Sequence, residues 1–84
     1  MDNDVQQRVI KAIADVLERK ENEIRLDASL RDDLNLDSLK QMTLSILLED
    51  EFHLTIPPED LMGIVTVKDI VDFIHRKLQE PAPT

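Results

Sequence analysis

Apolar residues recur at helical spacing in three parts of the chain, and the first part lies near the N-terminus. Its apolar positions are Val5, Val9, Ala12, Ile13, Val16 and Leu17. Recurrence every three or four residues is typical of one apolar helix face. Asp2, Asn3 and Asp4 precede these positions and offer capping oxygens and negative charge to the positive end of a helix. The pattern predicts a first helix over residues 4–19.

The next segment, ENEIRLDASLRDDLNL, has apolar residues spaced through polar ones without sustained helical order. Its apolar positions are Ile24, Leu26, Leu30, Leu34 and Leu36. We interpret this segment as a long loop whose leucines anchor it to the core, with one short turn around Ser29–Asp33. Long loops in compact domains are usually functional, so this loop is a candidate functional segment.

The segment from Ser38 to Phe52 contains neither Gly nor Pro and has the length of an ordinary helix, but its apolar residues form two stripes. At roughly 100° per residue, with Leu39 at zero, one stripe lies between about 140° and 220° and the other within about 60° of zero. The first, which we name the core stripe, comprises Leu44, Leu48 and Phe52. The second, which we name the exposed strip, comprises Leu39, Met42 and Ile46.

One helix of a small bundle cannot bury both stripes. The core stripe, with Leu47 at its edge, continues further toward the end of the helix and is the natural core face. We therefore expect the exposed strip to remain partly accessible, bordered by Ser38, Thr43, Glu49 and Asp50. An apolar strip bordered by acidic residues is typical of a protein-binding surface. Alternatively, its residues are scattered surface hydrophobes or lie beneath the preceding loop.

Two prolines in HLTIPPEDLMGI predict a turn after this helix, followed by a short helical turn over Glu59–Met62 that the single glycine ends. Thr66 and Asp69 have the spacing of a capping box. An apolar stripe follows them and predicts a last helix that ends at about Leu78. The stripe comprises Val67, Ile70, Val71, Ile74 and Leu78. Pro81 stops this helix, and residues 81–84 are expected to form a flexible tail.

The length of 84 residues suffices for one domain with one modest core. Two Phe are the only aromatic residues, so the core must be aliphatic, which suits small helices. We therefore predict an all-α fold, a small bundle of three main helices plus one short helix, in a single domain over residues 1–80. The first helix starts just after Met1 and the chain ends shortly after the last helix. We expect a freestanding protein on this basis, with an excised module of a larger synthase as the alternative.

Eighteen acidic residues against ten basic ones give a formal net charge of -8. This charge repels nucleic acid and anionic membranes and favours partner proteins with basic patches. The chain has no Cys, which excludes disulfides, thiolate metal ligands and a cysteine nucleophile. No stretch approaches the length of a membrane span, and the N-terminus lacks the pattern of a signal peptide. We therefore expect a cytoplasmic monomer.

One set of motifs occurs in a defined order. Asp37-Ser38-Leu39 opens a helix after a first helix and a long loop anchored by leucines, and LLEDEFHLTIP and TVKDIVDFI follow. The second helix thus closes on a Glu-x-x-Phe-like pattern before Ile56-Pro57. The Asp-Ser-Leu triplet alone is weak evidence, whereas the whole set, from the first helix to Leu78, is specific. In this order and spacing the chain resembles an acyl carrier protein.

The resemblance implies that Ser38 carries a covalently attached 4'-phosphopantetheine arm, added from coenzyme A by a phosphopantetheinyl transferase with a magnesium ion. The arm supplies the thiol that a chain without Cys lacks, and it holds acyl groups as thioesters. Asp37 is expected, by similarity, to help orient the magnesium ion and the coenzyme. On position alone, Ser38 is an ordinary helix-start residue behind the N-cap Asp37.

By the same resemblance, the second helix binds the enzymes that load and use the arm, through basic patches on those enzymes. The implied partner-binding residues are Leu39, Lys40, Met42, Thr43, Ile46, Glu49 and Asp50. The family shelters its acyl chain between the second and third helices. The candidate acyl-pocket residues are therefore Leu48, Phe52, Ile56, Leu61 and Ile64, each of which is equally well an ordinary core residue. The protein is expected to be a substrate and scaffold for enzymes, with no catalytic residues of its own.

Two residues depart from the family pattern. Lys40 and Thr43 stand where acidic residues are most expected after Asp-Ser-Leu, while Glu49, Asp50 and Glu51 keep the later acidic cluster. Enzymes with basic patches would lose contact with the first half of the helix, whereas an acidic group on a partner could pair with Lys40. Two roles remain open. One is housekeeping fatty-acid synthesis, and the other is a specialised carrier for a dedicated synthetase, a polyketide or modified-lipid pathway, or an aminoacyl load.

A calcium-binding loop is one alternative from another class. Asp33, Asn35 and Asp37 have the one, three, five spacing of an EF-hand. Ser38 stands where Gly is needed for the sharp turn, however, and Leu44 stands where the bidentate Glu should be. We therefore predict no metal site.

An unmodified acidic helical adaptor that binds partners through the exposed strip is the main alternative. Catalysis by the chain itself is disfavoured, because neither His53 nor His75 has a carboxylate and a nucleophile nearby in the sequence. We interpret both histidines as surface residues.

Overall fold

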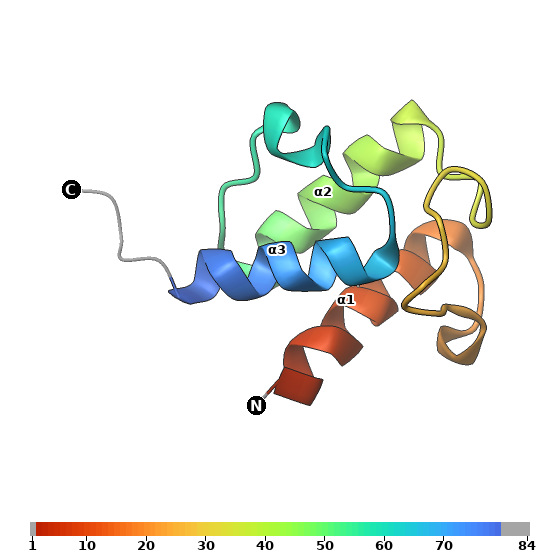
Figure 1. Cartoon of the computed structure of the whole chain (residues 1–84), viewed down its shortest axis with the longest axis horizontal. Coiled ribbons are helices and arrows are strands. Elements are labelled where there is room, and N and C mark those ends of the chain that lie inside the picture. Colours follow the sequence, from red (N-terminus) through yellow and green to blue (C-terminus); the bar gives the residue numbers. More distant parts are fainter. Residues whose placement is uncertain (1, 80–84) are drawn as a thin grey trace.

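The computed structural model describes residues 2–79 of the chain, with all side chains in this range except those of Asp2, Asn3 and Pro58. The elements are α1 (Asp2–Leu17), η1 (Glu21–Glu23), α2 (Ser38–Phe52), η2 (Pro58–Leu61) and α3 (Val67–Gln79), where η denotes a short 3-10 helix (Figure 1). The described residues contain no strand, although an isolated antiparallel bridge joins Ser29 to Thr66. The predicted all-α bundle is confirmed.

The helix boundaries match the prediction for α2 and differ by one or two residues elsewhere. α1 begins and ends two residues earlier than predicted, η2 begins and ends one residue earlier, and α3 extends one residue further. η1 does not follow from the sequence, because ENE has no apolar periodicity. The capping roles expected of Asp2 and Asn3 and the tail at 81–84 lie outside the described side chains and residues. No helix in the described part is long and apolar enough to cross a membrane.

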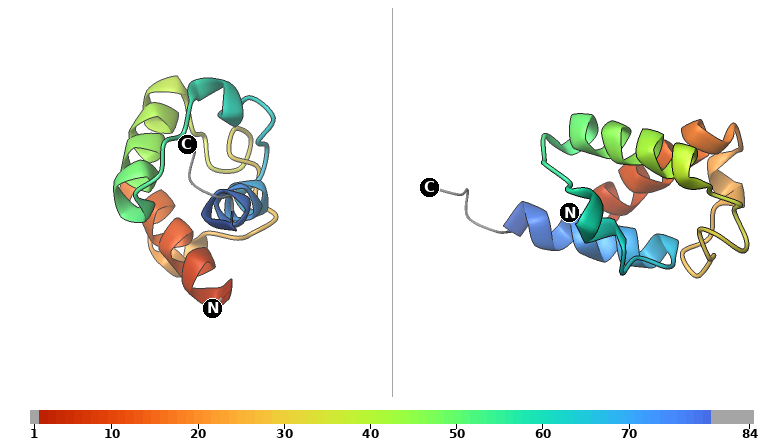
Figure 2. Two further views of the ribbon diagram at one scale, coloured as in Figure 1. Left: turned by 90° about the vertical axis from the view of Figure 1, so that its left-hand side faces the viewer. Right: turned by 90° about the horizontal axis from the view of Figure 1, so that it is seen from above.

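α1 is the element on which the other two main helices pack. Its residues Val9 and Ile13 are completely buried. The backbone of α1 comes close to both α2 and α3, whereas no Cα atom of α2 lies within 8 Å of one in α3. In the left-hand view of Figure 2, α2 and α3 accordingly lie apart, with α1 below and η2 above the space between them. Side chains of these elements extend into this space. Any volume that they leave unfilled would form a cavity there.

The core is mainly aliphatic, although both Phe52 and Phe73 are buried in it, and it contains no buried polar or charged residue among those described. The core stripe of α2 is buried, as predicted. The long loop between α1 and α2 contributes five buried side chains: Ile24, Ala28, Leu30, Leu34 and Leu36. The predicted anchoring of this loop by its apolar residues is therefore confirmed.

Backbone hydrogen bonds also hold the long loop in place. The Leu30 N–H donates to the Val65 carbonyl at 2.9 Å, next to the start of α3. The predicted turn forms at Ser29, whose N–H donates to the Asp33 carboxylate at 2.7 Å. Because the loop leads directly into α2, these bonds help to fix where α2 begins.

α3 begins at the predicted capping box. The Asp69 carboxylate accepts hydrogen bonds from the N–H groups of Val65 and Thr66, each at 3.0 Å, and the Thr66 hydroxyl accepts one from the Asp69 N–H at 3.2 Å. The box satisfies donors that a helix start leaves without partners. Since the backbone N–H groups of Val65 and Thr66 stabilise the ionised carboxylate, the pKa of Asp69 is lowered from its ordinary value.

Candidate functional site

Ser38 is the first residue of α2, and its side chain is exposed. The preceding residue, Asp37, is extended and caps the helix by accepting a hydrogen bond from the Lys40 N–H at 2.9 Å. No hydrogen bond among the described residues engages the Ser38 hydroxyl. A phosphate on this oxygen would lie at the positive end of α2, beside N–H groups that the helix itself cannot satisfy. The site therefore fits a phosphodiester.

Two surface hollows meet at Ser38. One, of about 370 Å³, is polar and is lined by Arg31, Asn35, Leu36, Asp37, Ser38 and Gln41. The other, of about 230 Å³, runs between α2 and η2 and is lined by Ser38, Gln41, Met42, Ser45, Leu61 and Met62. We name the second hollow the outer groove. A group attached to Ser38 could thus extend along a mainly apolar surface without displacing the backbone.

The exposed strip lies on the surface of α2. Leu39 is 73% exposed, Met42 63% and Ile46 59%. These residues therefore do not lie beneath the preceding loop, which removes one of the two alternatives. Met62 and Val65, after η2, are also large exposed apolar residues. Helical periodicity does not predict the exposure of either residue. For Met62, its position before a glycine in a proline-rich turn is a signal that could have indicated exposure.

Some charged residues of α2 are exposed, whereas others interact with neighbouring segments of the chain. Lys40 and Asp50 are exposed, as a partner-binding role requires. The Glu49 carboxylate instead accepts a hydrogen bond from the Ile56 N–H at 2.7 Å and so holds the segment after α2. Glu51 pairs with Arg8 of α1 at 3.2 Å. The later acidic cluster thus belongs partly to the fold, and the partner-binding role of Glu49 stays a prediction.

Thr43, the second residue that departs from the family pattern, is exposed near the middle of α2. Its hydroxyl donates to the Leu39 carbonyl at 3.1 Å, one turn earlier in the helix. This bond occupies the hydroxyl hydrogen and leaves the oxygen as an acceptor. Its partner-binding role also stays a prediction.

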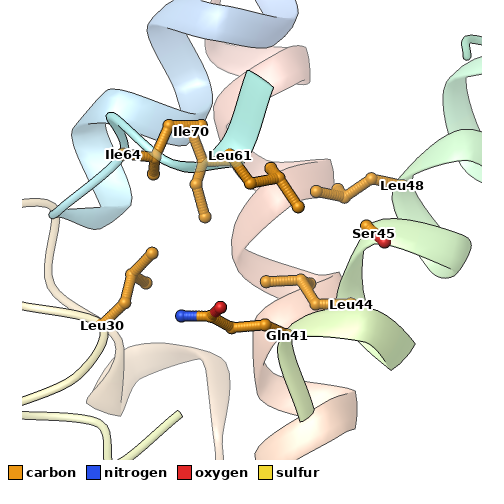
Figure 3. Close-up of a pocket in the computed structure, with 8 residues that line it drawn as sticks. All are labelled: Leu30, Gln41, Leu44, Ser45, Leu48, Leu61, Ile64 and Ile70. Carbon is orange, nitrogen blue, oxygen red and sulfur yellow. The ribbon is translucent and has the colours of Figure 1, made fainter. Parts of the chain in front are cut away.

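A small cavity of about 20 Å³ lies between α2, η2 and α3 (Figure 3). Its lining residues are Leu30, Gln41, Leu44, Ser45, Leu48, Leu61, Ile64 and Ile70. The volume is about that needed for one water molecule. An acyl chain can therefore occupy it only if side chains move apart.

Three of the five predicted pocket residues, Leu48, Leu61 and Ile64, line this cavity, and two do not. Phe52 is buried at the other end of α2, where the Arg8 guanidinium lies 4.4 Å from its ring centre. Ile56 is buried in the segment that follows. The structure thus corrects the expected grouping of Phe52 and Ile56 with the other three. Five cavity residues were not among those predicted: Leu30, Gln41, Leu44, Ser45 and Ile70. Gln41 and Ser45 were missed because both are polar.

The histidines and acidic residues form no site of their own in the described part of the chain. No group of three or more His, Asp or Glu side chains there is arranged to hold a metal ion. His53 is exposed and has a left-handed backbone with φ of 56°, and it ends α2 through its N–H bond to the Glu49 carbonyl.

The bundle thus presents an exposed serine at a capped helix start, beside a mainly apolar groove, as its resemblance to an acyl carrier protein implies. The family model for the phosphopantetheine attachment site matches residues 7–74 of the 84-residue chain. The chain therefore belongs to the phosphopantetheine-binding family and is an acyl carrier protein family member. Its domain is the site of covalent 4'-phosphopantetheine attachment.

Proposed function

We propose that Ser38 is the attachment residue and that the protein carries acyl groups as thioesters on its 4'-phosphopantetheine arm. The observation that carries this proposal is the Ser38 hydroxyl, exposed at the first residue of α2 and engaged by no hydrogen bond among the described residues. When attached, the arm supplies a terminal thiol. The chain itself contains no Cys that could take this role.

Two neighbours of Ser38 have distinct tasks in this proposal. The Asp37 carboxylate accepts a single hydrogen bond from the described residues, which leaves lone pairs to orient the magnesium ion and coenzyme A in the transferase complex. Arg31 lines the same polar hollow as Asp37 and Ser38 and places positive charge beside the attached phosphodiester.

The exposed strip is the surface that we assign to the partner enzymes, namely the phosphopantetheinyl transferase and the enzymes that load and use acyl groups. Its three apolar residues lie on the same helix as Ser38, and Asp50 provides negative charge at the far end. Lys40 places positive charge near the attachment end. We therefore infer partners that combine a basic patch with an acidic group opposite Lys40.

This charge pattern is compatible with fatty-acid, modified-lipid or polyketide-type synthesis. Specialised partners are favoured, because a uniformly basic docking patch would meet Lys40 unfavourably. An aminoacyl load is a further possibility within the same proposal.

Intact-mass measurement tests the attachment residue. The purified protein is incubated with coenzyme A, magnesium and a promiscuous phosphopantetheinyl transferase. We expect the mass of one phosphopantetheine to be gained by the natural chain and by Thr55→Ala, a control that removes an exposed hydroxyl outside the groove, but not by Ser38→Ala. If the natural chain gains no mass, the carrier proposal is wrong and the unmodified adaptor becomes the better interpretation. Equal modification of Ser38→Ala would place the attachment on another residue.

A further inference from the structure

The face of α2 that lines the cavity is partly polar. At roughly 100° per residue, Gln41 and Ser45 lie within about 60° of Ser38 around the helix. Both residues line the outer groove, which begins at Ser38, and both also line the inner cavity. Leu61 of η2 is the third residue that the two hollows share. These three residues therefore form the mouth between the outer groove and the cavity.

The mouth can open through movement of η2. No Cα atom of η2 lies within 8 Å of one in α2 or α3, so the backbone of η2 is not packed tightly against either helix. An ion pair between Asp60 of η2 and Lys77 of α3, at 3.6 Å, joins η2 to α3. Outward movement of Leu61 would join the outer groove to the cavity without breaking the backbone hydrogen bonds of α2 or α3.

The hydrogen-bonding capacity of the mouth is largely unused. The Ser45 hydroxyl donates to the Met42 carbonyl at 3.0 Å, which leaves its oxygen free to accept. No hydrogen bond among the described residues uses the side-chain amide of Gln41, which can both donate and accept. Figure 3 shows this amide extending toward Leu30.

The chemistry of the mouth discriminates between acyl chains. A saturated chain that passes through it removes water from Gln41 and Ser45 and returns no hydrogen bond, which is unfavourable. A ketone oxygen can only accept, so it satisfies the Gln41 amide alone. A hydroxyl group can both accept from the Gln41 amide and donate to the Ser45 oxygen, and it reaches both once the Gln41 amide turns from Leu30 toward Ser45. An ammonium group would have to bring its charge into an otherwise apolar cavity.

The position of the mouth also indicates where the oxygen should lie on the chain. Beyond Gln41 and Ser45 the lining is entirely aliphatic, with Leu30, Leu44 and Ile70 among its residues. The polar residues thus lie on the side nearest Ser38. The part of the cargo that meets them is the part nearest the thioester, and the apolar remainder of the chain lies deeper.

We propose that Gln41 and Ser45 are specificity-determining residues that make this carrier shelter 3-hydroxyacyl chains in preference to saturated chains of the same length. The proposal rests on the acyl-carrying function and on attachment at Ser38, and it deepens both by naming the class of cargo.

The test measures how well each cargo is protected from solvent. Octanoyl, 3-oxooctanoyl and 3-hydroxyoctanoyl phosphopantetheine are loaded from the corresponding coenzyme A thioesters by a promiscuous transferase. Cleavage of each thioester by hydroxylamine is then followed by intact mass. Division by the cleavage rate of the same acyl group on free pantetheine removes its intrinsic reactivity. We expect protection of 3-hydroxyoctanoyl to exceed that of octanoyl by at least about threefold, the effect of one modest hydrogen bond, with 3-oxooctanoyl between them.

Variants of the mouth residues test whether these residues cause the preference for 3-hydroxyoctanoyl. Gln41→Met keeps a side chain of similar length without the amide, and we expect it to abolish the preference by protecting octanoyl better and 3-hydroxyoctanoyl less well. Ser45→Ala should bring 3-hydroxyoctanoyl down to the level of 3-oxooctanoyl. Gln7→Met, the same change at an exposed position on α1, should keep the natural order. Thermal unfolding of each loaded variant confirms that it is folded.

The outcomes separate this proposal from the proposed function. Absence of any acyl-phosphopantetheine mass would overturn the carrier function itself. A loaded protein that protects octanoyl as well as 3-hydroxyoctanoyl, or that protects neither, would overturn the cargo preference and leave attachment intact. A preference that persists in both Gln41→Met and Ser45→Ala would show that these residues do not determine it.

Discussion

The two sides of the bundle differ in how completely their side chains are packed. Where α1 meets α3, Val9, Ile13 and Ile74 have no exposed surface. On the other side, between α2 and η2, Met42 and Met62 are largely exposed, and a small cavity lies between α2 and α3, whose backbones stay apart. The side chains between α1 and α3 are therefore closely packed, whereas the outer face of α2 is open to solvent.

The largest expected effect is the loss of stability caused by a cavity between α1 and α3. We expect Ile13→Ala to lower the free energy of unfolding by about 2–5 kcal/mol, because it removes completely buried methyl groups. Ile46→Ala, the same substitution on the exposed strip, should change it by less than about 0.5 kcal/mol. Urea unfolding of both variants measures the difference. Equal losses would show that the two sides are packed alike and would contradict the division.

A smaller effect on stability is expected from the capping box at the start of α3. Because the pKa of Asp69 is lowered in the folded protein, its carboxylate stabilises the fold above the ordinary pKa of Asp, about 3.9. This contribution is lost as the pH falls from there through the folded-state pKa. We expect Asp69→Asn to be less stable than the natural chain at pH 7 and to approach it in the acid range. Urea unfolding at several pH values tests this, and a constant difference would contradict it.

The smallest effect on stability is expected from a substitution on the exposed strip, which should also impair the interaction with partner enzymes. Met42→Glu should leave the free energy of unfolding within about 0.5 kcal/mol, as for typical surface substitutions, and should impair transfer to or from partner enzymes. The measurement is the rate of modification by the transferase, alongside urea unfolding. Gln7→Glu adds the same charge on α1 and should leave the modification rate unchanged. A large loss of stability in Met42→Glu would show that Met42 belongs to the core.

The helices and their faces could be predicted because both depend on local periodicity. The two stripes of α2 follow from the spacing of its apolar residues, and the structure buries Leu44 and exposes Met42 accordingly. The capping box at Thr66 and Asp69 was also predictable, because all of its hydrogen bonds lie within a few residues.

The composition of the cavity could not be predicted in the same way. Leu30 reaches it from the long loop and Ile64 from the segment after η2, so its lining depends on how distant segments are placed. Phe52 has the right spacing on α2 but lies against Arg8. Glu49 looks like a surface acid, yet its hydrogen bond to the Ile56 N–H depends on where the chain turns after α2.

By itself the sequence determined the all-α class, the extents of the main helices to within two residues, the two faces of α2 and the position of Ser38 at a helix start. Each of these is set by interactions between residues that are close along the chain. Only the tertiary structure decided that α2 and α3 stay apart, that Gln41 and Ser45 lie at the mouth between the outer groove and the cavity, and that Glu49 and Glu51 serve the fold. These features arise from contacts between distant segments, which no local pattern encodes.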